Sequence, residues 1–275
     1  MSTDATVLVD GEPVQVHRTG SGPPVLMLHG SGPGTTGVGA WGVTAQALAD
    51  SYEVVAPDHA GFGLSPLPAD RRSGLPPWAD RAAALMEAIG HPTYAVVGHS
   101  MGGAVALDLA SRFPERVTRV VAVATMGTPG APLSAALDAV WGAGTDRADA
   151  EDMLRRLLDD PALVTPAAVE ARHVAIRAGA AAYRELFPPP RERWSRALAL
   201  STEALRAIRA PVLLVHGAQD RLVPLAATRP LLHHLDHLDD VGLHVIDECG
   251  HVPAVEHPDA FQRLLLGFLR GTAST

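Results

Sequence analysis

The sequence predicts an α/β fold in which a mostly parallel central sheet carries helices on both faces and a helical lid is inserted over one edge of the sheet. Short runs of consecutive apolar residues, typical of buried parallel strands, alternate with helix-like stretches along most of the chain. The alternation stops between residues 127 and 209, where helix-like stretches follow one another. Residues 94–110 join an apolar run, a Gly-x-Ser-x-Gly turn and an Ala-rich helical stretch without a break.

Size and composition set limits on the kind of protein. A chain of 275 residues, 47% of them hydrophobic, can bury one large core with an inserted subdomain. The formal net charge is −8 and the 22 Lys and Arg residues form no basic run, so nucleic acid is not expected as a partner. Cys249 is the single cysteine, which excludes an intramolecular disulfide and a cysteine metal site. With no basic leader and no window apolar enough for a membrane helix, we expect a cytoplasmic protein without membrane contact.

The first half of the chain contains the patterns of most of the sheet. Residues 14–18 alternate apolar and polar side chains after the turn signal Asp10-Gly11, as an edge strand does. Continuous apolar runs predict buried strands at residues 25–28, 53–57, 94–97 and 117–124. Apolar residues at helical spacing predict helices at residues 41–49, 78–89 and 103–110.

The second half contains the lid and the end of the sheet. The helix-like stretches of the lid are residues 133–140, 151–158, 166–177 and 194–198. Because no strand separates them, a lid over the active-site edge is favoured over ordinary helices of the main layers. The sheet resumes with strands at residues 212–215 and 243–246, and with helices at 225–238 and 258–269. The predicted domains are a core of residues 1–126 and 210–275 and an inserted lid of residues 127–209.

A glycine-rich loop, residues 29–34, follows the first buried strand and admits two interpretations. The pattern Gly-x-Gly-x-x-Gly at residues 32–37, with Asp58 about 20 residues further on, resembles a dinucleotide-binding fingerprint. However, the pattern begins four residues after the strand, Pro33 lacks an amide donor, and the next helix is expected only at Trp41. We therefore favour a catalytic loop whose free backbone amides face a ligand.

The turn at Gly98-His99-Ser100-Met101-Gly102 has the context of a nucleophile elbow. Small residues beside the serine allow a strained turn that exposes its hydroxyl at the sheet edge. Asp220 and His251 each follow a late strand, so their side chains should reach the same edge. We assign Ser100 as the nucleophile, His251 as the general base and acid, and Asp220 as the residue that orients the histidine. Asp247 lies too close to His251 in sequence to replace Asp220, and Asp58 precedes the serine.

Several further residues have both a functional and a structural interpretation. The Met101 amide and a glycine-rich loop amide, which we assign to Ser31, would form an oxyanion hole. His29 is expected to brace that loop. Trp141 and Phe187 either line a pocket or fill the lid core. One of Arg172 and Arg177 would bind an anionic substrate if it faced inward, whereas a solvated helix surface would explain both.

A metal site is not expected. His233, His234 and His237 lie close together in sequence, but an exposed helical face explains them as well. The chain lacks a His-Glu-x-x-His motif. Cys249 is interpreted as a small packed residue beside the catalytic loop rather than as a reactive thiol.

Many segments of the chain are similar to those of one known family. In the core these are Leu28-His29-Gly30-Ser31-Gly32-Pro33-Gly34, Gly61-Phe62-Gly63-Leu64-Ser65, Gly98-His99-Ser100-Met101-Gly102-Gly103 and Cys249-Gly250-His251. In the lid they are Trp141-Gly142, Met153-Leu154-Arg155-Arg156-Leu157-Leu158, Glu170-Ala171-Arg172 and Phe187-Pro188-Pro189-Pro190-Arg191. They resemble the meta-cleavage product hydrolases, carbon–carbon bond hydrolases of aromatic-ring degradation, and within these the 2-hydroxymuconate semialdehyde hydrolase branch. The likeness covers nearly the whole chain.

The resemblance implies an α/β-hydrolase fold and a serine hydrolase without cofactor. Its small, anionic substrate would be a dienol carboxylate that tautomerises to a keto form before a Ser–His–Asp triad cleaves the bond. The chain order of Ser100, Asp220 and His251 is the one found in α/β-hydrolases. Arg172 falls where the family places its substrate-binding arginine. The resemblance leaves a homo-oligomer open and implies that the substrate also lies against Gly32, Ala40, Trp141, Phe187 and Val252.

Two of these positions depart from the family pattern. The family usually has Asn at the position of Ala40 and Trp at the position of Val252. Both changes remove contacts near the tautomerising end of the substrate and leave the catalytic residues in place. An esterase or lactonase is therefore an alternative, and a non-catalytic small-molecule binder is a third hypothesis, disfavoured because a binder does not need all three of Ser100, Asp220 and His251.

Overall fold

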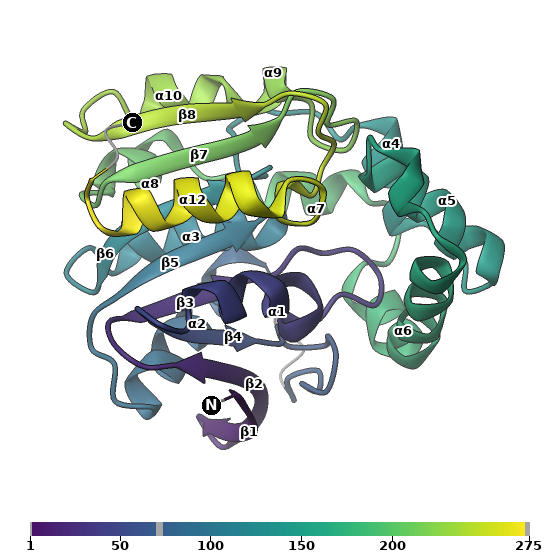
Figure 1. The fold of residues 1–275 in the computed structure, drawn as a ribbon, viewed down its shortest axis with the longest axis horizontal. Coiled ribbons are helices and arrows are strands. Elements are labelled where there is room, and N and C mark those ends of the chain that lie inside the picture. The colour runs from purple at the N-terminus through teal and green to yellow at the C-terminus, as the bar shows by residue number, and fades with distance from the viewer. Residues whose placement is uncertain (1, 70–73, 273–275) are drawn as a thin grey trace.

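One sheet runs through the molecule (Figure 1). The computed structural model describes residues 2–69 and 74–272, and within them eight strands follow the order β1-β2-β4-β3-β5-β6-β7-β8. Only the two pairs that involve β2 are antiparallel, which confirms the mostly parallel sheet predicted from the apolar runs. The strands are β1 (Ser2–Val9), β2 (Glu12–Gly20), β3 (Pro24–Leu28), β4 (Glu53–Pro57), β5 (Tyr94–His99), β6 (Val117–Val123), β7 (Val212–Gly217) and β8 (Val241–Ile246).

The first two strands form a hairpin that the sequence predicted only in part. Asp10 and Gly11 have φ angles of 51° and 82°, as a tight type I′ turn requires, so the predicted turn is confirmed. The expectation that residues 14–18 form an edge strand is wrong, because β1 pairs with the outer side of β2. Most side chains of β1 are exposed, and its sequence therefore lacks the apolar pattern of a buried strand.

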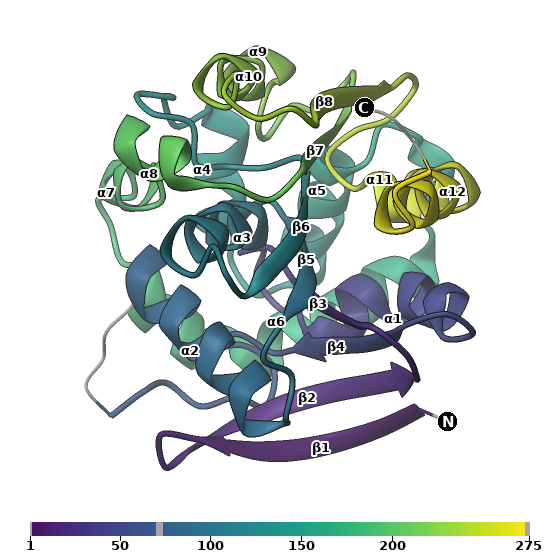
Figure 2. The same ribbon diagram turned by 90° about the vertical axis from the view of Figure 1, so that its left-hand side faces the viewer.

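Helices cover both faces of the sheet (Figure 2). One face carries α1 and α12, where Trp41 stacks on Phe261 with ring centroids 6.3 Å apart. The other face carries α2, α3 and α8 (Thr202–Ala207). Alternate strand residues enter the two cores, as Met27 and Leu28 of β3 show. The helices outside the lid are α1 (Gly37–Leu48), α2 (Leu75–Ala88), α3 (Met101–Arg112), α9 (Leu225–Thr228), α10 (Pro230–His234), α11 (Pro253–Glu256) and α12 (Pro258–Leu269).

The lid lies between β6 and β7 in sequence, and no strand interrupts it along residues 124–211, all of which are described. Its helices α4 to α6 lie beyond the carboxyl ends of the parallel strands, whereas α8 packs beside α3 (Figure 1). Capping residues fix where the helices begin: Ser134 accepts from the Leu137 amide, and Asp146 and Asp149 form a capping box. The lid helices are α4 (Ala135–Trp141), α5 (Arg147–Leu157), α6 (Pro166–Leu186), α7 (Glu192–Ala197) and α8 (Thr202–Ala207).

Two helix boundaries differ from the predicted ones for identifiable reasons. Helix α1 begins at Gly37 rather than at residue 41, because Thr36 caps it by accepting a hydrogen bond from the Gly39 amide. The segment expected to be one helix at residues 225–238 is divided into α9 and α10. Pro230, which has no N–H, begins the second helix.

Candidate active site

Ser100 sits on a strained turn between β5 and α3. Its φ of 55° and ψ of −114° place it in a region that L-residues rarely adopt. The backbone around it is fixed, since the Ser100 amide donates to the Val123 carbonyl at 2.8 Å. A Cβ atom at Gly98 would lie 2.1 Å from the Gly102 carbonyl oxygen, so the turn can close only with glycine at residue 98.

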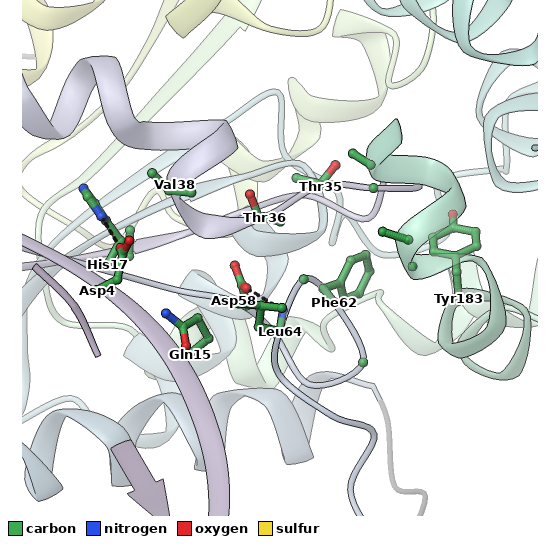
Figure 3. Close-up of a pocket in the computed structure, with 17 residues that line it drawn as sticks. Asp4, Gln15, His17, Thr35, Thr36, Val38, Asp58, Phe62, Leu64 and Tyr183 are labelled. Atoms are coloured by element: carbon green, nitrogen blue, oxygen red, sulfur yellow. Dashed lines mark hydrogen bonds and ion pairs between the residues drawn. The ribbon is translucent and has the colours of Figure 1, made fainter. Parts of the chain in front are cut away.

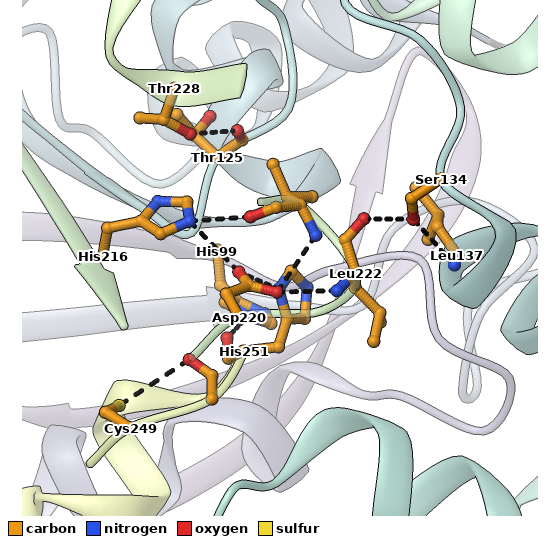
Figure 4. Close-up of polar contacts among 12 residues, drawn as sticks. His99, Thr125, Ser134, Leu137, His216, Asp220, Leu222, Thr228, Cys249 and His251 are labelled. Carbon is orange, nitrogen blue, oxygen red and sulfur yellow. Dashed lines mark hydrogen bonds and ion pairs between the residues drawn. The ribbon is translucent and has the colours of Figure 1, made fainter. Parts of the chain in front are cut away.

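Asp220 and His251 are in direct contact (Figure 4). His251 Nδ1 lies 2.8 Å from Asp220 Oδ2, and both side chains are buried. The other carboxylate oxygen accepts from the amides of Leu222 and Val223 at 2.8 and 3.0 Å. With Asp220 ionised, His251 Nδ1–H donates to it and Nε2 keeps its lone pair, as a general base requires.

The charge state of Asp220 follows from its neighbours. Burial alone would raise the pKa of this carboxyl, but the electrostatic interaction with the His251 ring and hydrogen bonds from His216 and His251 hold the pKa well below its ordinary value. His216 Nε2 lies 3.3 Å from Asp220 Oδ2 and donates to the Val223 carbonyl at 2.8 Å. Sequence reasoning missed His216, although its position at the end of β7 could have pointed to Asp220.

A cavity of about 370 Å³ brings most of the predicted site residues together. Ser100 and His251 both line it, and so do Ser31 of the glycine-rich loop and Arg172 of α6. The remaining predicted residues on its wall are Gly32, Ala40 and Val252, and its apolar lining includes Leu137, Val140, Leu154, Leu157 and Leu222. Met101 is buried in the core and begins α3, so its amide is at the N-terminal end of the helix that follows Ser100.

The glycine-rich loop is braced from two sides. His29 Nδ1–H donates to the Gly30 carbonyl at 2.8 Å and Nε2 accepts from the His59 amide at 2.9 Å, while burial lowers the pKa of His29. From the lid, the Tyr183 hydroxyl donates to the Ser31 carbonyl at 2.9 Å. The bracing expected of His29 is thus present, whereas no sequence pattern marked Tyr183.

Trp141 and Phe187 do not lie among the residues that line this cavity. The Trp141 indole donates to Ser31 Oγ at 2.8 Å and stacks on the Phe187 ring with centroids 5.5 Å apart. Both side chains are buried. The two rings therefore pack among aromatic neighbours of the lid core, and the Trp141 indole contacts the glycine-rich loop through Ser31.

Arg172 points from α6 into the cavity without an acidic partner. Its Nη1 donates to the Pro33 carbonyl at 3.2 Å and to Thr35 Oγ1 at 3.4 Å. Burial lowers the pKa of this guanidinium. Among the described side chains no carboxylate forms an ion pair with it. Arg177, the other lid arginine considered, is exposed to solvent.

The competing acids and the nucleotide hypothesis find no support in the geometry. Asp58 accepts from the Gly37 amide at 2.7 Å and from the Leu64 amide at 3.0 Å, so its carboxylate is already used by the backbone. Asp247 is exposed and accepts from Gln219 at 3.0 Å. A second cavity, of about 270 Å³, lies beside Asp58 between the β1–β2 hairpin and α6 (Figure 3), and neither Ser100 nor His251 lines it.

The histidines considered for a metal do not gather. His237 donates to the Ile208 carbonyl at 2.9 Å, and within residues 2–69 and 74–272 no group of three His, Cys, Asp or Glu side chains could hold an ion. Cys249 is buried, and burial together with the nearby Glu256 carboxylate raises the pKa of its thiol. In the described part of the chain, none of the helices has the length and apolar character needed to cross a membrane.

Comparisons with known proteins identify the family to which this fold belongs. The sequence profile of the alpha/beta hydrolase fold matches residues 23–258. A 2-hydroxymuconate semialdehyde hydrolase of Pseudomonas sp. (strain CF600) is 38% identical, covering 96% of this chain and 92% of the relative. A 2-hydroxy-6-oxo-2,4-heptadienoate hydrolase of Pseudomonas putida is 36% identical, covering 96% and 95%. The solved meta-cleavage product hydrolase of Pseudomonas fluorescens IP01 superposes with a TM-score of 0.92 at 32% identity, covering 98% of both chains. The chain therefore belongs to the α/β hydrolase fold family and, within it, to the meta-cleavage product hydrolases.

Proposed function

We propose that this hydrolase cleaves a carbon–carbon bond in a meta-cleavage-type dienol keto acid similar to 2-hydroxymuconate semialdehyde. The products would be a 2-hydroxydienoate and a carboxylic acid. The two relatives described above carry the names of such reactions, and their similarity extends along almost the whole chain. The proposal assigns to this chain the same substrate class and leaves the substrate side chain open.

The proposed chemistry uses Ser100, His251 and Asp220 as a triad. His251 takes the proton of Ser100 as its oxygen attacks the carbonyl carbon of the keto tautomer. The amides of Met101 and Ser31 stabilise the resulting oxyanion. The carbon–carbon bond then breaks with its electron pair entering the dienolate, which His251 protonates. Water, activated by the same histidine, releases the carboxylic acid from Ser100.

We infer the anionic substrate class from the position of Arg172 in the cavity. Arg172 is partly buried, and removing a guanidinium from water is costly unless an anion compensates its charge; no acidic side chain of the described residues forms an ion pair with it. It shares the cavity with Ser100 and His251. A substrate carboxylate bound to Arg172 would supply the missing charge and fix the reacting carbonyl near the serine.

A paired assay tests the proposal. One arm follows the loss of visible absorbance of 2-hydroxymuconate semialdehyde or an alkyl analogue, and the other follows p-nitrophenol release from short esters. We expect fast dienol cleavage that is abolished in Ser100→Ala. Ester turnover by a protein that leaves the dienol untouched contradicts carbon–carbon cleavage.

The cavity wall supports an esterase or lactonase as a second candidate. Ala40 and Val252 both line the cavity and place apolar surface where the family usually carries Asn and Trp. The site loses polar contacts there, which would otherwise assist the tautomerisation, and an ester needs no such step. The ester arm of the assay measures this activity directly.

A further inference from the structure

The loop that carries His251 is fastened to the end of lid helix α5. The His251 amide donates to the Leu157 carbonyl at 2.7 Å. Beside it, a Cβ atom at Gly250 would lie 2.6 Å from the Leu157 carbonyl oxygen and 2.9 Å from the Asp159 nitrogen. The lid backbone therefore rests directly on the histidine loop, at a distance that only glycine permits.

Glu256 joins the same two segments with one carboxylate. Its Oε1 accepts from the Gly250 amide at 2.9 Å. Its Oε2 accepts from the Asp159 amide at 2.6 Å and from the Asp160 amide at 3.3 Å. Each oxygen thus serves a different segment, and hydrogen bonds from backbone amides to a charged acceptor are among the stronger ones in proteins.

The loop that carries Asp220 is fastened to the same stretch of the lid. Arg221, the next residue, places Nη2 2.8 Å from Asp159 Oδ1 and donates from Nη1 to the Arg155 carbonyl at 3.3 Å. Further along this loop, the Leu222 carbonyl accepts from Ser134 Oγ of the lid at 2.6 Å (Figure 4). Both members of the Asp220–His251 pair are therefore tied to the lid as well as to the sheet.

We propose that residues 157–160 of the lid form a positioning element for the Asp220–His251 pair, with Glu256 as the positioning residue that joins this element to the histidine loop. The inference rests on the proposed triad function. It predicts that the end of α5 cannot move without displacing the His251 imidazole. Either substrate enters the cavity without a movement of α5, or the enzyme is inactive while α5 is displaced. Glu256 touches no reacting atom and acts through His251.

The test compares two substitutions at Glu256. Glu256→Asp keeps the charge but is one methylene shorter and cannot reach both segments, whereas Glu256→Gln keeps the length and offers one oxygen. We expect Glu256→Asp to lower kcat roughly 10- to 100-fold with KM within about twofold, because the cavity wall is intact and the imidazole is displaced. Glu256→Gln keeps one oxygen contact but turns its NH₂ group toward a backbone N–H of the other segment, so its kcat should fall as well. Glu151→Gln is the matched control, since within the described part of the chain the Glu151 carboxylate pairs with Arg155 on the surface of α5 and with no group of the histidine loop.

A spectroscopic signal separates this inference from the proposed function. The proton shared by His251 Nδ1 and Asp220 gives a downfield resonance in histidine-labelled protein, identified by its loss in Asp220→Asn. We expect the resonance to shift or broaden in Glu256→Asp and to stay unchanged in Glu151→Gln, whichever substrate is turned over. If the protein does not cleave the dienol but the resonance shifts in Glu256→Asp, the proposed function is wrong and the positioning role of Glu256 is still supported. Wild-type kcat and an unchanged resonance in folded Glu256→Asp or Glu256→Gln overturn it.

Discussion

Arg172 places a positive charge on the wall of the cavity that Ser100 and His251 also line. Its guanidinium is partly buried, and among the described residues its hydrogen-bond partners are a carbonyl and a hydroxyl oxygen, so much of its donor capacity faces the cavity. Such a group binds an anion strongly because little water has to be displaced from it and the local dielectric constant is low. The specificity of the site should therefore depend on this one charge.

Replacing Arg172 by Ala should separate anionic from neutral substrates. A charge-assisted hydrogen bond contributes about 1.5–3 kcal/mol, so KM for a dienoate should rise roughly 10- to 100-fold. KM for a neutral p-nitrophenyl ester should change little. Arg177→Ala, which removes an exposed charge from the same helix, should alter neither. Equal losses on both substrates would mean that Arg172 only supports the lid.

Trp141 offers a second prediction at the residue scale. Trp141→Phe keeps an aromatic ring against Phe187 but removes the donor to Ser31 Oγ. We expect the free energy of unfolding to fall by about 1 kcal/mol and kcat to fall several-fold as Ser31 becomes less well held. Trp194→Phe also removes one indole hydrogen bond, to the Pro188 carbonyl, and should lower stability without lowering kcat. Matching effects on kcat in both variants would argue against a role of Trp141 in holding Ser31.

Helix α1 depends on a carboxylate from another element. Asp58, which follows β4, accepts from the Gly37 amide in the first turn of α1 and so satisfies a donor that has no partner within the helix. Its second oxygen holds the Leu64 amide. Thr36 adds a side-chain cap to the same turn. The start of α1, and the wall of the cavity that it forms, are thus fixed by residues outside the helix.

Asp58→Asn should destabilise the protein measurably. The asparagine side chain has one oxygen for the two backbone donors, the Gly37 and Leu64 amides. Its NH₂ group would face the N–H of the other donor. We expect the free energy of unfolding to fall by about 2 kcal/mol, because a buried hydrogen bond to a charged group is lost. Urea denaturation of this variant beside Asp50→Asn, an exposed substitution after α1, measures the difference. Equal stability of the two variants would contradict a stabilising role of the hydrogen bonds from the Gly37 and Leu64 amides to Asp58.

Most elements could be predicted from the sequence because buried strands and amphipathic helices leave strong patterns. The continuous apolar runs of β3, β4 and β5 lie close to their observed bounds. The exposed strand β1 could not be found, since its pairing depends on β2 and not on burial. The start of α1 was missed because its first turn is glycine-rich and its stability comes from Asp58, which is distant in sequence.

The sequence predicted those site residues that belong to a recognisable motif or follow a strand. It did not predict contacts that depend on how the lid packs against the core. Ser100, Asp220 and His251 follow strands whose carboxyl ends meet at one edge, so their approach could be expected from the strand pattern. The inward direction of Arg172 could not, because helix periodicity at α6 does not mark which polar residue faces the cavity. The contacts of Trp141 and Tyr183 with Ser31 depend on where the lid rests, which no local pattern specifies.

At the scale of the whole molecule, buried neutral histidines make stability depend on pH. Burial lowers the pKa of His29 and, aided by His29, that of His59. Burial and the neighbouring His251 lower the pKa of His99 to about 3. Each folded value lies below the unfolded value of about 6.5, so on acidification the unfolded chain takes up protons first. Their contribution to stability is complete above that value and is lost as the pH falls below it.

Urea denaturation at several pH values tests this expectation. Between pH 7 and pH 5 the free energy of unfolding should fall, and His99, whose pKa is lowered to about 3, should contribute roughly 1 kcal/mol per pH unit below pH 6.5. His99→Gln should make this slope shallower, whereas His244→Gln, which removes an exposed histidine, should leave it unchanged. A free energy that stays level over this range contradicts the neutral state of the buried rings.

The strand order also has a consequence for how the protein is made. The six strands β1 to β6, complete by Val123, are contiguous neighbours in the sheet, and β7 and β8 are added afterwards at one side. A nascent chain can therefore assemble most of its sheet, and the strained turn at Ser100, while the ribosome is still translating the lid. Asp220 and His251 emerge later, so the proposed general base and the residue that orients it are added only after the turn that carries Ser100 is already in place.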